Sequence, residues 1–268
     1  HQWPPQGSSL QLGPVHVGLG PFGGAAELPV LWRIGPVPGS FTAQMQGQLS
    51  IAATHSQARY ALPSAVKDFR QLYPQVTLNL HQGSPQHVAE MLIRGEADIG
   101  IATEALAQYD QLVTLPCYRW THSVVVPPDH PLLDGEPLTL QRLSKFPLIT
   151  YDSGYTGRAH IDEAFAKEGL HPQVVLSAMD ADVIKTYVEL GMGVGVVASI
   201  AYDEERDRNL RAMDAGHLFA VNMTRLAFRR GAFLRTYVYA FIETFAPPLT
   251  RQVVDHAAAH HDSGASLE

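Results

Sequence analysis

The sequence predicts an α/β protein with two lobes, and three observations support this fold class. From Gly47 onward, short apolar stretches typical of strands alternate with stretches that have helical apolar spacing. The same alternation starts again near Thr121. A last strand and a last helix, around residues 224–245, could pack in the first lobe. The expected boundaries are 47–118 plus about 224–255 for lobe I, and 119–223 for lobe II.

The first lobe begins with three strands separated by two helices. The helix expected at 58–72 contains Pro63 and stops before Pro74, so it either kinks at Pro63 or becomes regular there. The next helix starts at Pro85, with Ser84 as its N-cap. This order predicts parallel strands joined by right-handed crossovers. The strands are expected at 49–53, 76–81 and 98–102.

The second lobe repeats this order. Its strands are expected at 123–126, 147–151, 174–177 and 194–198, and its helices at 158–168 and 182–190. In α/β folds of this type, small ligands bind in the crevice outside the carboxyl ends of the strands. We therefore expect a ligand cleft between the lobes.

Composition limits the function classes. The 268 residues are 46% hydrophobic and contain no apolar run long enough to span a membrane, so we expect no membrane partner. The net charge is −7, from 26 acidic and 19 basic residues, and a body of this sign binds nucleic acid poorly. Cys117 is the single cysteine, and its apolar strand-like surroundings indicate a buried thiol. Without a disulfide framework, a reducing, cytoplasmic location is expected.

The two ends of the chain differ from the rest. Residues 1–46 are rich in glycine and proline and have no sustained helical or strand period. They resemble neither a signal peptide nor a helix-turn-helix, and a disordered linker, a cloning remnant and an out-of-frame translation would all look like this. Residues 256–268 are expected to form a tail.

The most informative motif is Thr54-His55-Ser56-Gln57, directly after the first strand. It places hydroxyl and amide donors where a helix begins, and a helix start also offers free backbone N–H groups and a positive dipole end. Ordinary capping needs only one such hydroxyl, whereas here three donors, Thr54, Ser56 and Gln57, are clustered. The motif therefore predicts an anion site.

Three further loops have the same position at strand ends. Thr103 follows the third strand, Thr156 lies in the loop Tyr155–Arg158 before a helix of the second lobe, and Ser84 follows Gly83. Each residue alone is more often a cap or a turn residue than a ligand. Their shared position, in both lobes, is what favours a common binding site.

Other motifs have simpler interpretations. The glycines of Gly191–Gly195 precede a strand, the reverse of a dinucleotide-binding turn, and indicate tight helix-to-strand packing. His256 and His260 are spaced like a metal pair, but a solvated terminal helix is the favoured interpretation. Asp180 and Asp182 suit a helix start. We expect no catalytic residues, no metal site, no cofactor and no enzymatic activity.

These motifs also carry a family resemblance. The sequence is similar, over about residues 47–255, to the effector domains of CysB-like LysR-type transcription regulators of the cysteine regulon. The matching blocks are Thr54–Pro63, His81–Pro85, Ala102–Ala105, Leu115–Tyr118, Asp180–Val188, Gly191–Val196, Phe228–Arg230 and Phe245–Pro247. One departure is Ser56, where that family commonly has threonine; it keeps the hydroxyl and loses a methyl group.

The resemblance implies two Rossmann-like lobes of the periplasmic-binding-protein type, with the ligand cleft between them. It implies that Thr54, Ser56, Gln57, Thr103 and Thr156 line an anion pocket. The implied effectors are sulfate, O-acetylserine or N-acetylserine, and the implied assembly is a homodimer or homotetramer. DNA would be bound only through a helix-turn-helix that has no counterpart here. The alternative function is a periplasmic-type solute-binding protein for an oxyanion.

Overall fold

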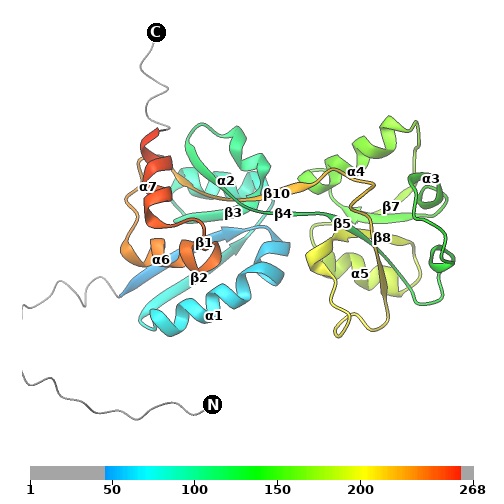
Figure 1. The fold of residues 1–268 in the computed structure, drawn as a ribbon, viewed down its shortest axis with the longest axis horizontal. Coiled ribbons are helices and arrows are strands. Elements are labelled where there is room, and N and C mark those ends of the chain that lie inside the picture. Colours follow the sequence, from blue (N-terminus) through cyan, green and yellow to red (C-terminus); the bar gives the residue numbers. More distant parts are fainter. Residues whose placement is uncertain (1–45, 261–268) are drawn as a thin grey trace, which may run out of the picture. The chain divides into compact units, whose positions relative to one another are not determined.

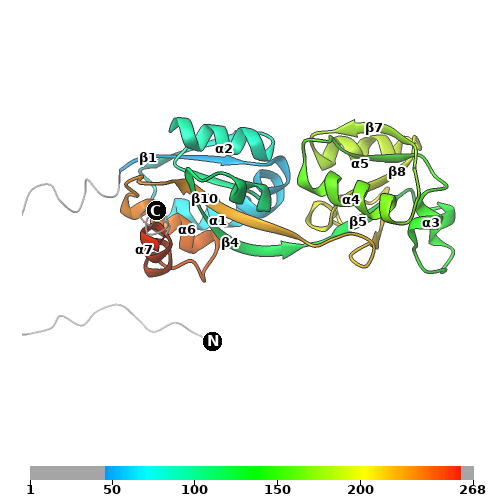
Figure 2. The same ribbon diagram turned by 90° about the horizontal axis from the view of Figure 1, so that it is seen from above.

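The computed structural model describes residues 46–260 (Figures 1 and 2). This range forms two five-stranded sheets, which confirms the predicted two-lobed α/β class. We name the sheet β2-β1-β3-β10-β4 and its helices lobe I, and the sheet β7-β6-β8-β5-β9 and its helices lobe II. The expectations for residues 1–45 and 261–268 lie outside the described residues.

Lobe I contains a mixed sheet. Strand β1 pairs in parallel with β2 and β3, as predicted, but β10 inserts antiparallel between β3 and β4. Strand β10, the last strand of the chain's described part, therefore belongs to lobe I, as predicted. The strands are β1 (Gly47–Ala53), β2 (Val76–Gln82), β3 (Ile99–Thr103), β4 (Leu112–Trp120) and β10 (Asn222–Arg229).

Helices cover both faces of this sheet. Because side chains alternate along a strand, Leu49, Ile51 and Ala53 of β1 face one core cluster and Ala52 faces another. The first cluster includes side chains of α1 (Leu62–Leu72), α6 (Thr236–Phe245) and α7 (Arg251–His260), and the second includes α2 (Pro85–Arg94). Figure 2 shows α2 on the side of the sheet opposite to α1 and α6. The expected tail is thus helical as far as His260.

The first helix starts irregularly, next to the predicted anion motif. Residues Gln57–Ala61 form a π-helix, η1, and the regular helix α1 begins at Leu62 with Pro63 in its first turn. Of the two outcomes predicted at Pro63, the structure shows the second. Ser84 caps α2 as predicted, since its hydroxyl accepts a hydrogen bond from the His87 N–H at 3.3 Å.

Lobe II has the same general organisation. Strand β6 pairs in parallel with β7 and β8, whereas β5 pairs antiparallel with β8 and β9. The short elements α3 and β9 were not predicted. The strands are β5 (His122–Val126), β6 (Leu148–Tyr151), β7 (Val174–Ala178), β8 (Val194–Ala198) and β9 (Arg211–Asp214), and the helices are α3 (Leu140–Leu143), α4 (Thr156–Lys167) and α5 (Ala181–Glu189).

The packing interpretation of the glycine-rich stretch is confirmed at Gly195. A Cβ atom at this position would lie 2.5 Å from Val125 Cγ2 and 2.8 Å from Val188 Cγ2. Glycine therefore allows α5 and β5 to approach β8 closely. This is a packing role, not a nucleotide-binding one.

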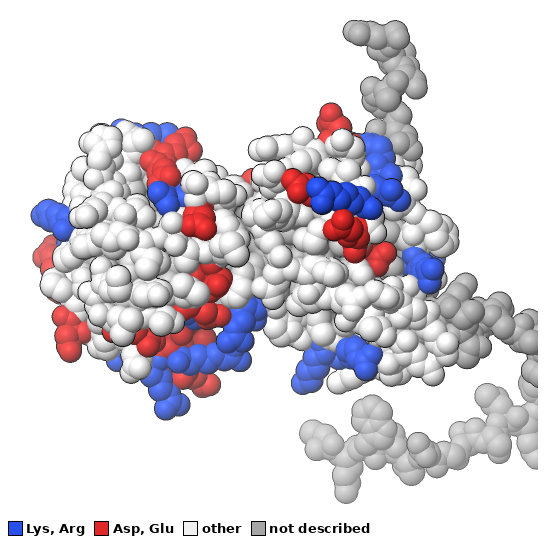
Figure 3. Space-filling model, turned by 180° about the vertical axis from the view of Figure 1, so that it is seen from behind, with Lys and Arg blue, Asp and Glu red and all other residues white. Residues whose placement is uncertain are grey.

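The described surface has no region dominated by basic side chains on the face shown in Figure 3, where acidic and basic residues are interspersed over both lobes. This agrees with the net charge of −7. None of the helices among the described residues is long and apolar enough to cross a membrane.

Candidate functional site

A small pocket lies where the two lobes meet, and all five residues predicted to bind an anion line it. Thr54 directly follows β1, Thr103 ends β3, and Thr156 is the first residue of α4. Ser56 and Gln57 lie at the start of η1. The pocket is lined by Thr54, Ser56, Gln57, Thr103, Trp120, Tyr151, Tyr155, Thr156 and Gly157. Their role in binding stays a prediction.

A hydrogen bond between hydroxyls joins the lobes inside this pocket. The Oγ1 atoms of Thr103 in lobe I and Thr156 in lobe II lie 2.5 Å apart. Each hydroxyl carries one proton and two lone pairs, so one proton of the pair forms this bond and the other remains available. The pair can therefore still donate a hydrogen bond to a ligand.

The Gln57 amide is held in place by two neighbours. Its Oε1 accepts a hydrogen bond from the Tyr118 hydroxyl, and its Nε2 donates to Thr224 Oγ1 at 3.1 Å. The side chain is buried, and these two bonds fix which end of the amide faces each neighbour. One N–H of the amide remains for a ligand.

Two helix starts face the pocket without side-chain caps. Neither Ser56, at the start of η1, nor Tyr155, at the start of α4, forms a side-chain capping hydrogen bond. The first N–H groups of a helix have no partner within it, and they attract anions. Gly157 allows close packing here, because a Cβ atom would lie 3.0 Å from His122 Nε2 and 3.4 Å from Trp120 Cη2.

Aromatic side chains form the remaining wall. The sequence predicted Tyr155 in a candidate loop but did not predict Trp120 and Tyr151. Trp120 is the last residue of β4, and Tyr151 is the last residue of β6. Burial raises the pKa of Tyr151 to about 12, so its hydroxyl stays protonated. That hydroxyl accepts a hydrogen bond from the Ala198 N–H at 2.9 Å and keeps its own proton to donate.

The residues that line the pocket are all uncharged. His122 packs edge-on against Trp120, with a ring-centroid distance of 5.3 Å, and burial lowers the pKa of His122 to about 4. His122 is therefore neutral at physiological pH. An anion in this pocket would be held by neutral donors and helix starts, not by a cation.

A second contact between the lobes is charged, and we name it the Asp182 contact. Arg59 Nε lies 3.1 Å from Asp182 Oδ2, and the Tyr60 hydroxyl donates to Asp182 Oδ1 at 2.5 Å. Burial opposes ionisation of Asp182, but the hydrogen bonds from Tyr60 and Arg59 outweigh it, so the pKa of Asp182 is below its ordinary value. Lys185 Nζ lies 3.4 Å from the same carboxylate.

Other singled-out residues have structural roles. Asp180 caps α5, as predicted, since its Oδ1 accepts a hydrogen bond from the Val183 N–H at 2.8 Å. Ser84 caps α2 and does not line the pocket. Cys117 is partly buried against the core of lobe I, and burial raises the pKa of its thiol to about 12. A thiol with such a pKa is not a nucleophile at neutral pH.

Comparisons with known proteins agree with this architecture. The family described as LysR substrate binding domain matches residues 42–247. The chain is 53% identical over 231 residues to the HTH-type transcriptional regulator CysB of Burkholderia cenocepacia, covering 86% of this chain and 73% of that protein. It is 57% identical over 209 residues to the HTH-type transcriptional regulator SsuR of the same species, covering 78% of this chain and 68% of that protein.

A solved structure supports the same assignment. The crystal structure of the cofactor-binding domain of the Cbl transcriptional regulator superposes with a TM-score of 0.76 and 50% sequence identity, covering 80% of this chain and 93% of that domain. Together with the family match, this confirms the resemblance and the two-lobed fold that it implied. The chain belongs to the family of LysR substrate-binding domains.

Proposed function

We propose that this chain is the effector-binding domain of a LysR-type transcription regulator of sulfur assimilation and cysteine biosynthesis. The observation that carries the proposal is the convergence of five predicted donors from both lobes on one pocket. Similarity to transcription regulators named CysB and SsuR supports a sensor, not an enzyme.

The effector is a small anion, and the pocket favours sulfate over an acetylated serine. The cavity volume is about 30 Å³. A single water occupies roughly 10–15 Å³, so the space suits a compact group. O-acetylserine or N-acetylserine would enter only if the lobes moved apart. The five donors are Thr54, Ser56, Gln57, Thr103 and Thr156.

Effector binding would act through the arrangement of the lobes. The ligand contacts both lobes, so it stabilises the arrangement in which Thr103 and Thr156 are close. In a complete, cytoplasmic regulator assembled as a homodimer or homotetramer, this would change the spacing of the DNA-binding domains. The DNA would be bound by a helix-turn-helix and not by the lobes described above.

The test is calorimetric titration of the chain with sulfate, O-acetylserine and N-acetylserine. We expect sulfate to bind, and Thr54→Val to weaken its binding about tenfold, because loss of one hydrogen bond to a charged ligand costs about 1.5 kcal/mol or more. The matched control is Thr77→Val, which removes an exposed hydroxyl from β2 of the same sheet. Absence of both heat and a melting shift with all three ligands would refute the proposal.

A further inference from the structure

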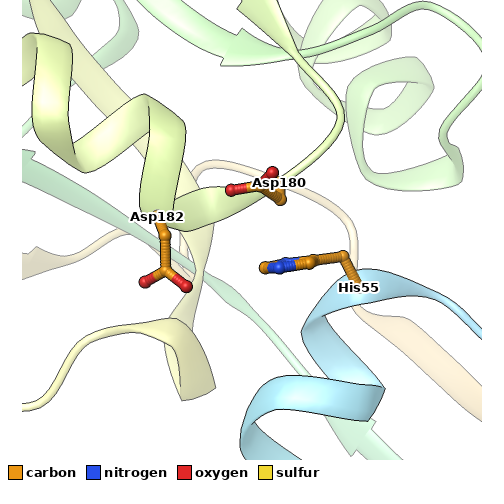
Figure 4. Close-up of side chains that lie close together, drawn as sticks. All are labelled: His55, Asp180 and Asp182. Atoms are coloured by element: carbon orange, nitrogen blue, oxygen red, sulfur yellow. The ribbon is translucent and has the colours of Figure 1, made fainter. Parts of the chain in front are cut away.

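Three potential metal ligands lie together between the lobes, next to the pocket. His55 comes from the start of the first helix of lobe I, and Asp180 and Asp182 come from the start of α5 in lobe II (Figure 4). One nitrogen or oxygen atom from each side chain lies within 4.8 Å of the other two. All three side chains are partly buried.

These side chains are not bonded to one another. His55 Nδ1 is buried and has no hydrogen-bond partner among the described residues, and neither carboxylate forms an ion pair with His55. Asp180 uses its Oδ1 to cap α5. A buried polar atom without a partner is costly, so a partner for the His55 nitrogen is expected.

We propose that His55, Asp180 and Asp182 bind a divalent transition-metal ion of the Zn²⁺ class between the lobes. Imidazole and carboxylate are the usual nitrogen and oxygen ligands of such ions, at about 2.0–2.2 Å, so ligand atoms flanking an ion lie up to about 4 Å apart. The three side chains would close by less than about 1 Å to reach this geometry. Three protein ligands leave one position for water.

The surrounding charges set the strength of the site. Both oxygens of Asp182 already accept hydrogen bonds, from Arg59 and Tyr60, so an ion would have to displace one of these groups. Lys185 also competes with a cation, whereas Asp180 and Asp207 favour one. The carboxylates nearby thus outnumber the basic side chains. We expect binding weaker than at a closed structural zinc site.

A bound ion would also affect the neighbouring pocket. His55 lies between Thr54 and Ser56, so the ion would add positive charge beside an otherwise uncharged anion site. This consequence rests on the proposed function: Zn²⁺ and sulfate would then strengthen the binding of each other by the same factor. The metal site itself requires no effector.

The experiment is a calorimetric titration with ZnCl₂ in chloride buffer without sulfate. The chain is first given His260→Ala and His261→Ala, since the histidines at positions 256, 260 and 261 could bind zinc themselves. In this background, His55→Phe removes the imidazole, and Asp180→Asn removes a charge while keeping a good N-cap residue. His171→Ala, an exposed histidine of lobe II, is the matched control.

We expect the background chain to bind one Zn²⁺, both site variants to bind it at least tenfold more weakly, and the control to be unchanged. If His55→Phe fails to fold, Asp180→Asn decides. Absence of Zn²⁺ binding, or equal binding by the background and Asp180→Asn, would overturn the proposal. Because sulfate is absent, this result is independent of whether the pocket binds an effector.

Discussion

Two of the contacts that join the lobes beside the pocket have opposite chemistry. The Thr103–Thr156 contact is neutral and short, and Thr103 is only 7% exposed. The Asp182 contact is charged and open to water, with the side chains of Arg59 and Asp182 exposed by 50% and 38%. A neutral hydroxyl pair can change partners at little cost, whereas an exposed ion pair is screened by water and salt. The difference predicts that the neutral contact responds to an effector, whereas the charged contact responds to salt.

The largest expected loss of stability comes from replacing Lys185, which lies next to the Asp182 contact. Lys185 Nζ is 2.9 Å from both oxygens of Asp207 and 2.8 Å from the Ala201 carbonyl oxygen, and the Lys185 side chain is 8% exposed. Lys185→Met leaves the buried Asp207 without a cation, so the free energy of unfolding should fall by about 3–5 kcal/mol. Urea denaturation followed by circular dichroism measures this loss.

The matched control for this substitution is Lys67→Met, which removes an exposed lysine from α1 and should change the unfolding free energy very little. Adding Asp207→Asn to Lys185→Met should restore part of the stability, because the uncompensated charge is then removed. A loss below about 1 kcal/mol for Lys185→Met would show that the buried pair does not support α5.

On the neutral side, Thr103→Val keeps the side-chain shape and removes the hydroxyl that meets Thr156. The free energy of unfolding should fall by about 1 kcal/mol, because one buried hydrogen bond is lost. Sulfate affinity should fall about tenfold or more, since a ligand would lose a donor as well. Calorimetry and urea denaturation of the same sample separate the two effects, and Thr103→Ser should restore both.

If Thr103→Val lost stability but bound sulfate normally, the contact would be structural only, and the role of the neutral contact in effector binding would be refuted. Retained stability with lost affinity would instead strengthen it. The two measurements therefore distinguish the functions assigned to this contact.

The comparison also shows which features the sequence could predict. Thr54 and Thr103 lie at the ends of the neighbouring strands β1 and β3, which meet at one edge of the sheet, so their convergence was predictable. Thr156 begins a helix of the other lobe, and its position was predictable only from the expected cleft between the lobes. The Asp182 contact was not predictable from residue patterns, because Arg59 and Asp182 are 123 residues apart and each also suits an exposed helix position.

Hydrophobic patterns in the sequence did not predict the short elements, nor the direction in which a strand pairs. Helix α3 and strand β9 have four residues each, too few for a hydrophobic period to show. The direction of β10 depends on its neighbours in lobe I, whereas its apolar pattern indicates only a strand. Trp120 and Tyr151 were not predicted to line the pocket, because an aromatic residue at the end of a strand is equally typical of the core.

The smallest expected effect distinguishes the two contacts most directly. Arg59→Gln removes the exposed cation from the Asp182 contact but leaves the hydrogen bond from Tyr60. The unfolding free energy should fall by about 0.5 kcal/mol or less at low salt, and by nothing measurable in 1 M NaCl, where screening acts within about 3 Å. The loss caused by Thr103→Val should be the same at both salt concentrations, since it involves no charge. Urea denaturation of both variants in 20 mM and 1 M NaCl makes the comparison, and a salt-independent loss in Arg59→Gln would mean that the arginine contributes by packing and not by its charge.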